Sequence, residues 1–492
     1  MILHKNKVGV APRLRALRGV KAAAAFFFCF SPAVCSAGAP AAAGKYNVVM
    51  VLMETLRPDH LGCYGYGRAT SPNLDKLAAE GTVFENAFSQ SSQSLISAAS
   101  VFTGLYPPSH GVVRADQHLS PSIPTLAGEL REHGYKTAAF TSGFFLNKGF
   151  GLGSGFGVYD DSKDFGTLAD VLPGAVNWLR ANKGGRFFLL VHGYDAHAPY
   201  RDPEEFRDKF SGGYSGQLSG VPLDYNLADR IWKDWLYEDF RLKKKVAPLE
   251  KSDVAYIVSQ YDGAILYADS EIGGLLAELE AQGLKENTIV VFMSSAGEAL
   301  LDHGTILSSF HGGLYDEGIH VPLIMRVPGV PAARVKTPVQ LVDVLPTVLD
   351  LEGFAVPAGA QGASLKPALE GRDMPARTVY AQTLSLKTGA PYMGIRKYPW
   401  KLFLEDGNYE LFNLASDPGE QKNAAAGQPA ALKDMKDELA RLLGKMPRRA
   451  IKGGPRPLAE VAARMKALGY WWVDRPRVDY WSEKRRKAGA GK

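Results

Sequence analysis

Continuous runs of β-branched and other apolar residues recur along this chain and restrict its fold more than any other feature. They stand at residues 47–53, 187–192, 288–294 and 321–327, and residues 136–142 predict a further strand. A strand that is apolar at every position is buried on both faces, as in a parallel sheet covered by helices. Amphipathic helical patterns lie between the runs, at 73–81, 123–133 and 254–282. The chain therefore predicts an α/β fold with a doubly wound, mainly parallel sheet.

The pattern changes near Arg377. Short strand-like runs with an Asp406-Gly407 turn predict a smaller antiparallel sheet, and residues 428–443 predict a helix. Residues 211–247 are aromatic and charged without clear periodicity, which predicts an insertion. The expected organisation is a leader at 1–37, a main α/β domain at 45–375, an antiparallel C-terminal subdomain at 376–447 and a basic tail at 448–492.

The first residues have the composition of a secretory signal peptide. Six Lys or Arg and no acid precede an apolar run at 22–34, which is too short to span a bilayer comfortably. Small residues then offer cleavage after Ala37 or Ala39. We expect an exported protein, periplasmic or extracellular, and a leader retained as an anchor is the alternative. Cys29 and Cys35 fall in this leader, so Cys63 has no partner for an internal disulfide.

The charge balance does not favour a nucleic-acid partner. The formal net charge is +6, and removal of the six basic residues of the leader leaves a net charge of 0. The tail from Arg441 carries fifteen Lys or Arg against four acidic residues. Such a tail is typical of a solvated segment or one that packs on an acidic body, and contact with an acidic membrane surface is the alternative.

Polar side chains gather where the predicted strands end. Glu54, His192, His197 and residues 294–298 all follow buried strands, and ligands of such sheets bind at the carboxyl ends of strands. A serine-rich stretch at 91–113 has two interpretations. It begins a helix, because serine is a good helix cap, or it presents a nucleophilic hydroxyl on a turn.

Seven segments, in order, resemble the sulfatase family of the alkaline-phosphatase-like superfamily. They are NVVMVLMETLRPDHLGCYGYGRATSPNLDKLAAEG, FTGLYPPSHGV, HAPY, YDGAILYADSEIGGLL, DEGIHVPLIMRVPG, LVDVLPTVLDLEG and NYELFNLASDPGEQKNAA. The resemblance covers nearly all of the chain after the leader. It implies hydrolysis of a sulfate ester, or in relatives of a phosphate ester, or transfer of a phospholipid head group. It also implies a divalent cation, Ca²⁺ or Mg²⁺, that polarises the ester and activates the nucleophile.

The resemblance places the nucleophile at Ser94. The family builds its nucleophile from Cys or Ser in a Cys/Ser-x-Pro-x-Arg context and converts it to formylglycine. Here Ile96 and Ala98 stand in place of the proline and the arginine. Because the recognition elements are missing, we expect Ser94 to remain serine. His197 and His311 are the other catalytic candidates, and each is alternatively a buried, hydrogen-bonded histidine.

The metal site departs further from the family pattern. Glu54 stands where the family has its strand-end Asp, and a carboxylate is kept. Ser295 and Ala296 stand where the family has Asp followed by His or Asn. A hydroxyl is a weak ligand for a hard cation and a methyl group is none. Residues 302–304, Asp-His-Gly, align with a second, downstream element of the family. Cation binding is therefore in doubt.

Three hypotheses follow. The first is an exported sulfatase-like hydrolase of an anionic ester, with impaired activity. The second is an inactive homologue that keeps the fold to bind an anionic glycan, lipid or partner. The third, a phospholipid head-group transferase, is favoured only by Glu54 and the leader. The sequence leaves open whether the chain is an enzyme, and the missing ligands favour impaired or absent sulfatase turnover.

Overall fold

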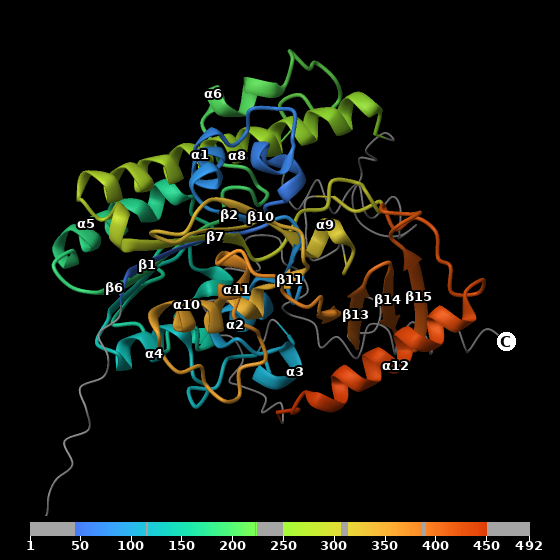
Figure 1. Ribbon diagram of the computed structural model, residues 1–492. Coiled ribbons are helices and arrows are strands. Elements are labelled where there is room, and N and C mark those ends of the chain that lie inside the picture. The colour runs from blue at the N-terminus through green and yellow to red at the C-terminus, as the bar shows by residue number, and fades with distance from the viewer. Residues whose placement is uncertain are drawn as a thin grey trace, which may run out of the picture. The chain divides into compact units, whose positions relative to one another are not determined.

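The computed structural model describes residues 45–114, 117–221, 223, 249–306, 313–385 and 390–449 (Figure 1). The expected leader, most of the 211–247 insertion, His311 and the tail from residue 450 lie outside the described residues. Within the described part of the chain, no helix is both long enough and apolar enough to cross a membrane.

The main sheet has eight strands in the order β10-β2-β9-β7-β1-β6-β4-β5. Their bounds are β1 Asn47–Met53, β2 Thr82–Phe84, β4 Lys136–Phe140, β5 Val158–Asp160, β6 Phe187–Gly193, β7 Thr288–Ser294, β9 Leu323–Arg326 and β10 Ala333–Val335. All neighbours are parallel except β9, which is antiparallel to both β2 and β7. The predicted mainly parallel sheet is confirmed.

Helices cover both faces of this sheet (Figure 1). Successive side chains of a strand point to opposite faces. Val48, Met50 and Leu52 of β1 accordingly join one core cluster, and Val49, Val51 and Met53 join the other. The first cluster includes side chains from α2 (Ser94–Thr103), α4 (Leu126–Glu132), α10 (Val344–Glu352) and α11 (Lys366–Leu369). The second includes α1 (Pro72–Glu80), α5 (Leu168–Asn182) and α8 (Lys251–Ala281).

The strand predicted at 321–327 is divided in two. β8 (His320–Val321) joins β3 (Ala87–Phe88) and β11 (Val339–Gln340) in a three-stranded sheet, whereas β9 belongs to the main sheet. Pro322 separates them. Proline has no N–H to donate to a ladder, so the chain changes sheets at this residue. The prediction of one continuous strand was wrong for this reason.

The remaining short elements connect the layers. The short α-helices are α3 (Pro107–His110), α6 (Glu204–Arg207) and α9 (Asp316–Ile319). The 3-10 turns are Pro58–His60, Gly62–Tyr64, Phe144–Leu146, Lys148–Phe150, Asp208–Phe210, Lys285–Asn287 and Leu341–Asp343.

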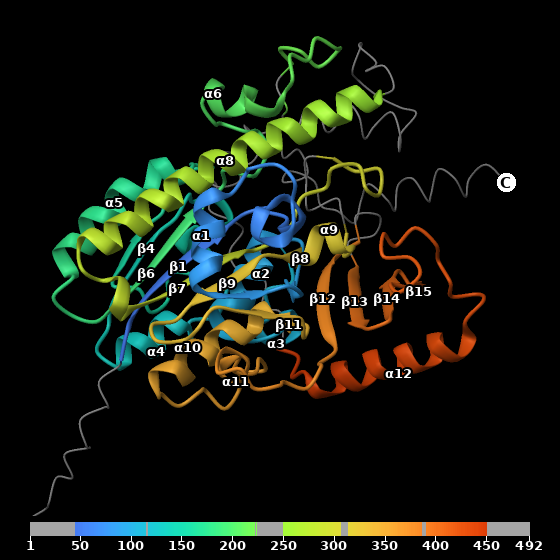
Figure 2. The same cartoon turned by 45° about the horizontal axis from the view of Figure 1, so that its top comes forward.

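A four-stranded antiparallel sheet and a long helix are the last elements of the described residues, as the sequence predicts. The sheet consists of β12 (Val379–Leu384), β13 (Pro391–Lys397), β14 (Trp400–Glu405) and β15 (Asn408–Asn413), and α12 spans Pro429–Lys445. Figure 2 shows α12 running along this sheet. Met435 and Leu439 of the helix pack on Tyr380, Ile395 and Leu402 of the sheet.

Lys401 of β14 joins this sheet to α9. Its side chain is 1% exposed, and its Nζ lies 2.6 Å from Asp316 Oδ1 and 2.7 Å from Glu420 Oε1. One buried ammonium thus balances two carboxylates from different parts of the chain. Removal of one partner of a buried ion pair is costly because the other charge loses its compensation.

We expect Lys401→Met to lower the free energy of unfolding by about 3–5 kcal/mol, because two acidic groups lose their shared cation. Urea unfolding followed by circular dichroism measures the loss. Lys397→Met is the matched control, since Lys397 is exposed at the end of β13. Equal stability of the two variants would contradict the assignment of Lys401 as the link between α9 and the C-terminal sheet.

Candidate functional site at the strand ends

The candidate site forms where three central strands end side by side. β1 lies between β6 and β7 and is parallel to both, with Met53 opposite Gly193 on one side and Ser294 on the other. Glu54 therefore emerges between the ends of its two neighbours. His192 lies at the end of β6, and Ser295 directly follows β7. The structure brings these residues together, as parallel strand ends do in this class of sheet.

Glu54 is fully buried, and both of its carboxylate oxygens are engaged. Oε1 lies 2.9 Å from His192 Nε2, and Oε2 accepts a hydrogen bond from the Ser295 hydroxyl. His192 and Ser295 are themselves 0% exposed. A buried carboxylate is tolerated when donors satisfy its oxygens, and this one has a donor on each.

The hydrogen-bond partners of His192 fix its tautomer. The Ser142 backbone N–H donates to Nδ1 at 3.3 Å, so Nδ1 is the acceptor and Nε2 carries the hydrogen that is donated to Glu54. The Ser142 hydroxyl also donates to the His192 carbonyl at 2.8 Å. Glu54 stands between Ser295 and His192. In a nucleophilic triad the histidine stands between the serine and the acid, so this arrangement does not activate Ser295.

His197 lies in the loop after β6, close enough to Glu54 for electrostatic interaction. Its Nδ1 is 2.6 Å from the Ala198 carbonyl oxygen, which only accepts, so Nδ1 carries a hydrogen. Burial lowers the pKa of His197 below its usual value, against the opposing effect of the Ala198 carbonyl and of Glu54. The ring is therefore neutral at pH 7, with the basic lone pair on Nε2.

Ser94 is the first residue of α2, and Gln93 is the N-cap residue of this helix. Ser94 is 7% exposed, and its side chain makes no hydrogen bond within the described residues. Gln93 Nε2 donates to Thr383 Oγ1 at 2.8 Å, which ties the start of α2 to β12. Ser94 hydrogen-bonds neither Glu54 nor His192, and His311 lies outside the described residues.

The residues present do not fit a Ca²⁺ or Mg²⁺ ion. The oxygens of Glu54 are engaged, and Ala296 offers only a buried methyl group. The Thr55 hydroxyl donates to the Ala196 carbonyl at 2.8 Å. Over the described ranges, no group of three or more His, Cys, Asp or Glu side chains is arranged to hold a metal ion. Hard divalent cations require several oxygen ligands.

The downstream Asp-His-Gly element does not replace the missing ligands. Asp302 Oδ2 is 2.6 Å from Nη1 of Arg57, and Nη2 of the same guanidinium pairs with Asp59. His303 Nδ1 is 2.6 Å from Glu317 Oε1. These contacts brace the loops near the site, and none of them reaches Glu54.

One residue near the site, Ser142, was missed by sequence reasoning. Ser142 had only its place at the end of a predicted strand to indicate a role. Glu298 belongs to the strand-end residues 294–298 that the sequence indicates. It is 0% exposed, and burial raises its pKa well above the usual value.

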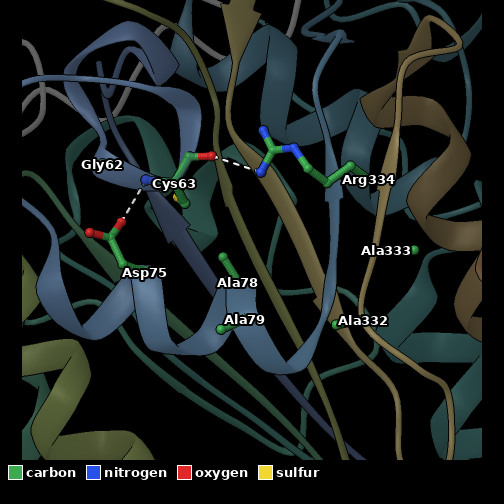
Figure 3. Close-up of a pocket in the computed structure, with 8 residues that line it drawn as sticks. All are labelled: Gly62, Cys63, Asp75, Ala78, Ala79, Ala332, Ala333 and Arg334. Carbon is green, nitrogen blue, oxygen red and sulfur yellow. Dashed lines mark hydrogen bonds between the residues drawn. The ribbon is translucent and has the colours of Figure 1, made fainter.

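A hollow of about 470 Å³ lies apart from these residues, beside α1 and β10 (Figure 3). It is lined by Gly62, Cys63, Asp75, Ala78, Ala79, Ala332, Ala333 and Arg334. Asp75 accepts from the Cys63 N–H at 2.7 Å, and Arg334 donates to the Cys63 carbonyl at 3.0 Å. Burial raises the pKa of the Cys63 thiol to about 12, which makes it a poor nucleophile. The charged groups of this hollow hold the loop in place.

The fold and the strand-end site define an α/β protein of the alkaline-phosphatase-like class. Residues 46–354 match the sulfatase family, and residues 311–447 match the family described as N-sulphoglucosamine sulphohydrolase, C-terminal. The chain belongs to the sulfatase family.

Similar proteins agree with this assignment. The chain is 25% identical to an arylsulfatase of Clostridium perfringens over 77% of this chain and 90% of the relative. It is 26% identical to a Δ4,5-hexuronate-2-O-sulfatase of Bacteroides thetaiotaomicron over 80% of this chain and 87% of the relative. The solved phosphonate monoester hydrolase of Agrobacterium radiobacter shares the fold, with a TM-score of 0.66 at 21% identity over 82% of this chain and 96% of that one.

A buried histidine holds α2 against α3. Ser100 Oγ lies 3.0 Å from His110 Nε2, and the Val112 N–H donates to His110 Nδ1 at 3.1 Å. The ring is therefore neutral, with its hydrogen on Nε2. Burial lowers the pKa of His110 to about 3. In the unfolded chain a histidine titrates near its ordinary pKa of 6.5, so acid favours the unfolded state.

We expect stability to fall with decreasing pH between about 6.5 and about 3, with His110 contributing up to about 1.4 kcal/mol per pH unit. His110→Gln removes this proton and should give a correspondingly flatter dependence on pH. Urea unfolding at pH 7, 6, 5 and 4 measures both chains in the same buffers. A variant that follows the wild-type slope throughout would exclude His110 as a source of the acid sensitivity.

Proposed function

We propose that the strand-end site recognises a sulfate or phosphate ester, most simply on a glycan, and that sulfatase turnover is impaired. The main support for this proposal is the contrast between the hydrogen bonding of two side chains. The Ser94 hydroxyl is left without a hydrogen bond in the described chain, whereas both oxygens of Glu54 are engaged. The nucleophile position is therefore usable while the cation position is not. Relatives named as sulfatases of hexuronate, N-acetylglucosamine and ulvan support a sulfated glycan as the ligand.

The chain's own residues supply a limited chemistry. The first turn of α2 presents backbone N–H groups without intrahelical partners, and such groups favour an anion. In the hydrolytic form of the proposal, Ser94 Oγ bonds to the sulfur or phosphorus while the alcohol oxygen leaves. The serine proton passes to a base, for which neutral His197 Nε2 is the candidate, and protonated His197 then returns a proton to the leaving alcohol oxygen. Water then releases the acid from Ser94.

An inactive homologue that binds an anionic glycan, lipid or partner is the second candidate. The replacement of carboxylate-class ligands by Ser295 and Ala296 favours it. Head-group transfer is supported only by Glu54 and by the basic, apolar leader. An exported location, either periplasmic or extracellular, also rests on that leader. The proposal includes contact of the basic tail with a membrane surface. It does not include a nucleic-acid partner.

We expect the protein to bind N-acetylglucosamine 6-sulfate and to hydrolyse 4-nitrophenyl sulfate or phosphate slowly, with Ser94→Ala abolishing the residual hydrolysis. Calorimetry measures binding, and absorbance measures 4-nitrophenol release. Ser92→Ala is the matched control, because Ser92 is a buried serine of the same segment whose hydroxyl has no hydrogen-bond partner among the described residues.

The outcomes separate the candidates. Binding without any turnover would identify an inactive homologue. Turnover that persists in Ser94→Ala would refute the nucleophile assignment, and rapid, Ser94-dependent sulfatase turnover would refute impairment. Absence of binding to every sulfated or phosphorylated probe would refute the proposal itself.

A further inference from the structure

We propose that Ser295 and His192 take the structural place of the divalent cation, so that this site is complete without a metal. The inference extends the proposed function. It depends on that proposal only for the assumption that the ligand binds at this site. Its basis is the hydrogen-bond network that joins the ends of four strands: β7 through Ser295, β1 through Glu54, β6 through His192, and β4 through Ser142.

The first step concerns the charge of Glu54. It is 0% exposed, so water does not solvate it. A cation in a metal-binding relative of the site would neutralise such a carboxylate. Here one oxygen receives the Nε2–H of His192 and the other receives the hydroxyl of Ser295. Hydrogen bonds to a charged group are stronger than those between neutral groups, and two of them satisfy the buried anion.

The second step concerns how firmly the donors are held. The Ser295 N–H donates to the Met53 carbonyl at 2.9 Å, which continues the pairing of β7 with β1 past the strand end. The His192 ring is fixed by the Ser142 N–H on its other nitrogen. Both donors are therefore positioned by the main sheet. A network set by strand register is preformed in the folded chain.

The third step concerns the ligand atoms that a cation would find beside Glu54. Entry of Ca²⁺ or Mg²⁺ would have to displace the Ser295 hydroxyl or the His192 N–H from Glu54. The Ala296 side chain contributes no ligand atom, and its carbonyl accepts from the Ser294 hydroxyl at 2.7 Å. The Thr55 hydroxyl is directed to the Ala196 carbonyl. A single carboxylate supplies one negative charge and too few oxygens for a hard divalent ion. The same side chains that satisfy Glu54 thus exclude the metal.

The first experiment measures metal content and thermal stability of the whole protein. We expect no stoichiometric Ca or Mg by elemental analysis, and the same Tm in EDTA, in Ca²⁺ and in Mg²⁺. A bound equivalent of either metal, or a saturable rise in Tm with either ion, would overturn the inference.

The second experiment tests Ser295 itself. Ser295→Ala leaves Oε2 of buried Glu54 without its donor and should lower the Tm by several degrees. Ser92→Ala removes an equally buried hydroxyl that makes no hydrogen bond in the part of the chain that the structure describes, so its Tm should stay close to that of the wild type. The inference fails if the two variants are equally stable.

The third experiment restores an acidic side chain. Ser295→Asp places a second carboxylate beside Glu54, and we expect a lower Tm in EDTA that Ca²⁺ partly restores. Wild-type stability of Ser295→Asp in EDTA would overturn the inference. Should this variant not fold, the first two experiments decide.

Binding of N-acetylglucosamine 6-sulfate in EDTA and in Ca²⁺ distinguishes this inference from the proposed function. Binding that requires Ca²⁺ would refute metal independence and leave the proposed function standing. Absence of binding in both buffers would refute the proposed function, while the Tm measurements would still decide the role of Ser295.

Discussion

The buried carboxylate of Glu54 is the constraint on which the rest of the site depends. A charge at 0% exposure is tolerated only with compensating partners, and the sheet supplies them from its own strand ends. Because β6 and β7 flank β1 in parallel, His192 and Ser295 approach Glu54 from opposite sides. The strand order therefore determines which side chains can satisfy this charge, and any change at one of the three residues is felt by the other two.

Much of the fold could be predicted because each central strand carries its own signal. β1 and β7 have the predicted bounds, β6 extends one residue further, and α8 differs from the predicted helix by a few residues. The three strands are apolar along their whole length, and α8 is a long, uninterrupted helical pattern, so local pattern and tertiary burial agree. The prediction failed at Pro322, where the chain leaves one sheet for another. Partner choice between strands is a non-local property that the apolar run at 321–327 does not encode.

The site was only partly predictable. Strand-end position identified Glu54, His192 and His197, since parallel strands place their ends together. Ser295 was interpreted as a lost ligand, because sequence reveals which atoms are missing and not what the remaining ones contact. Its hydrogen bond to Glu54 depends on the register of β7 with β1, and the donor role of His192 depends on an N–H from β4. Ser142 carried no signal beyond its place after a strand.

The departures from the family pattern that the sequence resemblance implies form a consistent set. A glutamate is one methylene longer than an aspartate, which helps one carboxylate reach donors on both neighbouring strands. Ser295 then supplies a hydrogen where the family pattern has an acid, and an acid there would repel Glu54 unless a cation lay between them. Ala296 needs no partner at all. We expect this arrangement to lower the rate of ester hydrolysis. Under the proposed function, a site without a divalent cation lacks the charge that would stabilise the negative charge developing on the ester in the transition state. The network that satisfies Glu54 is thus the physical reason to expect recognition without efficient turnover.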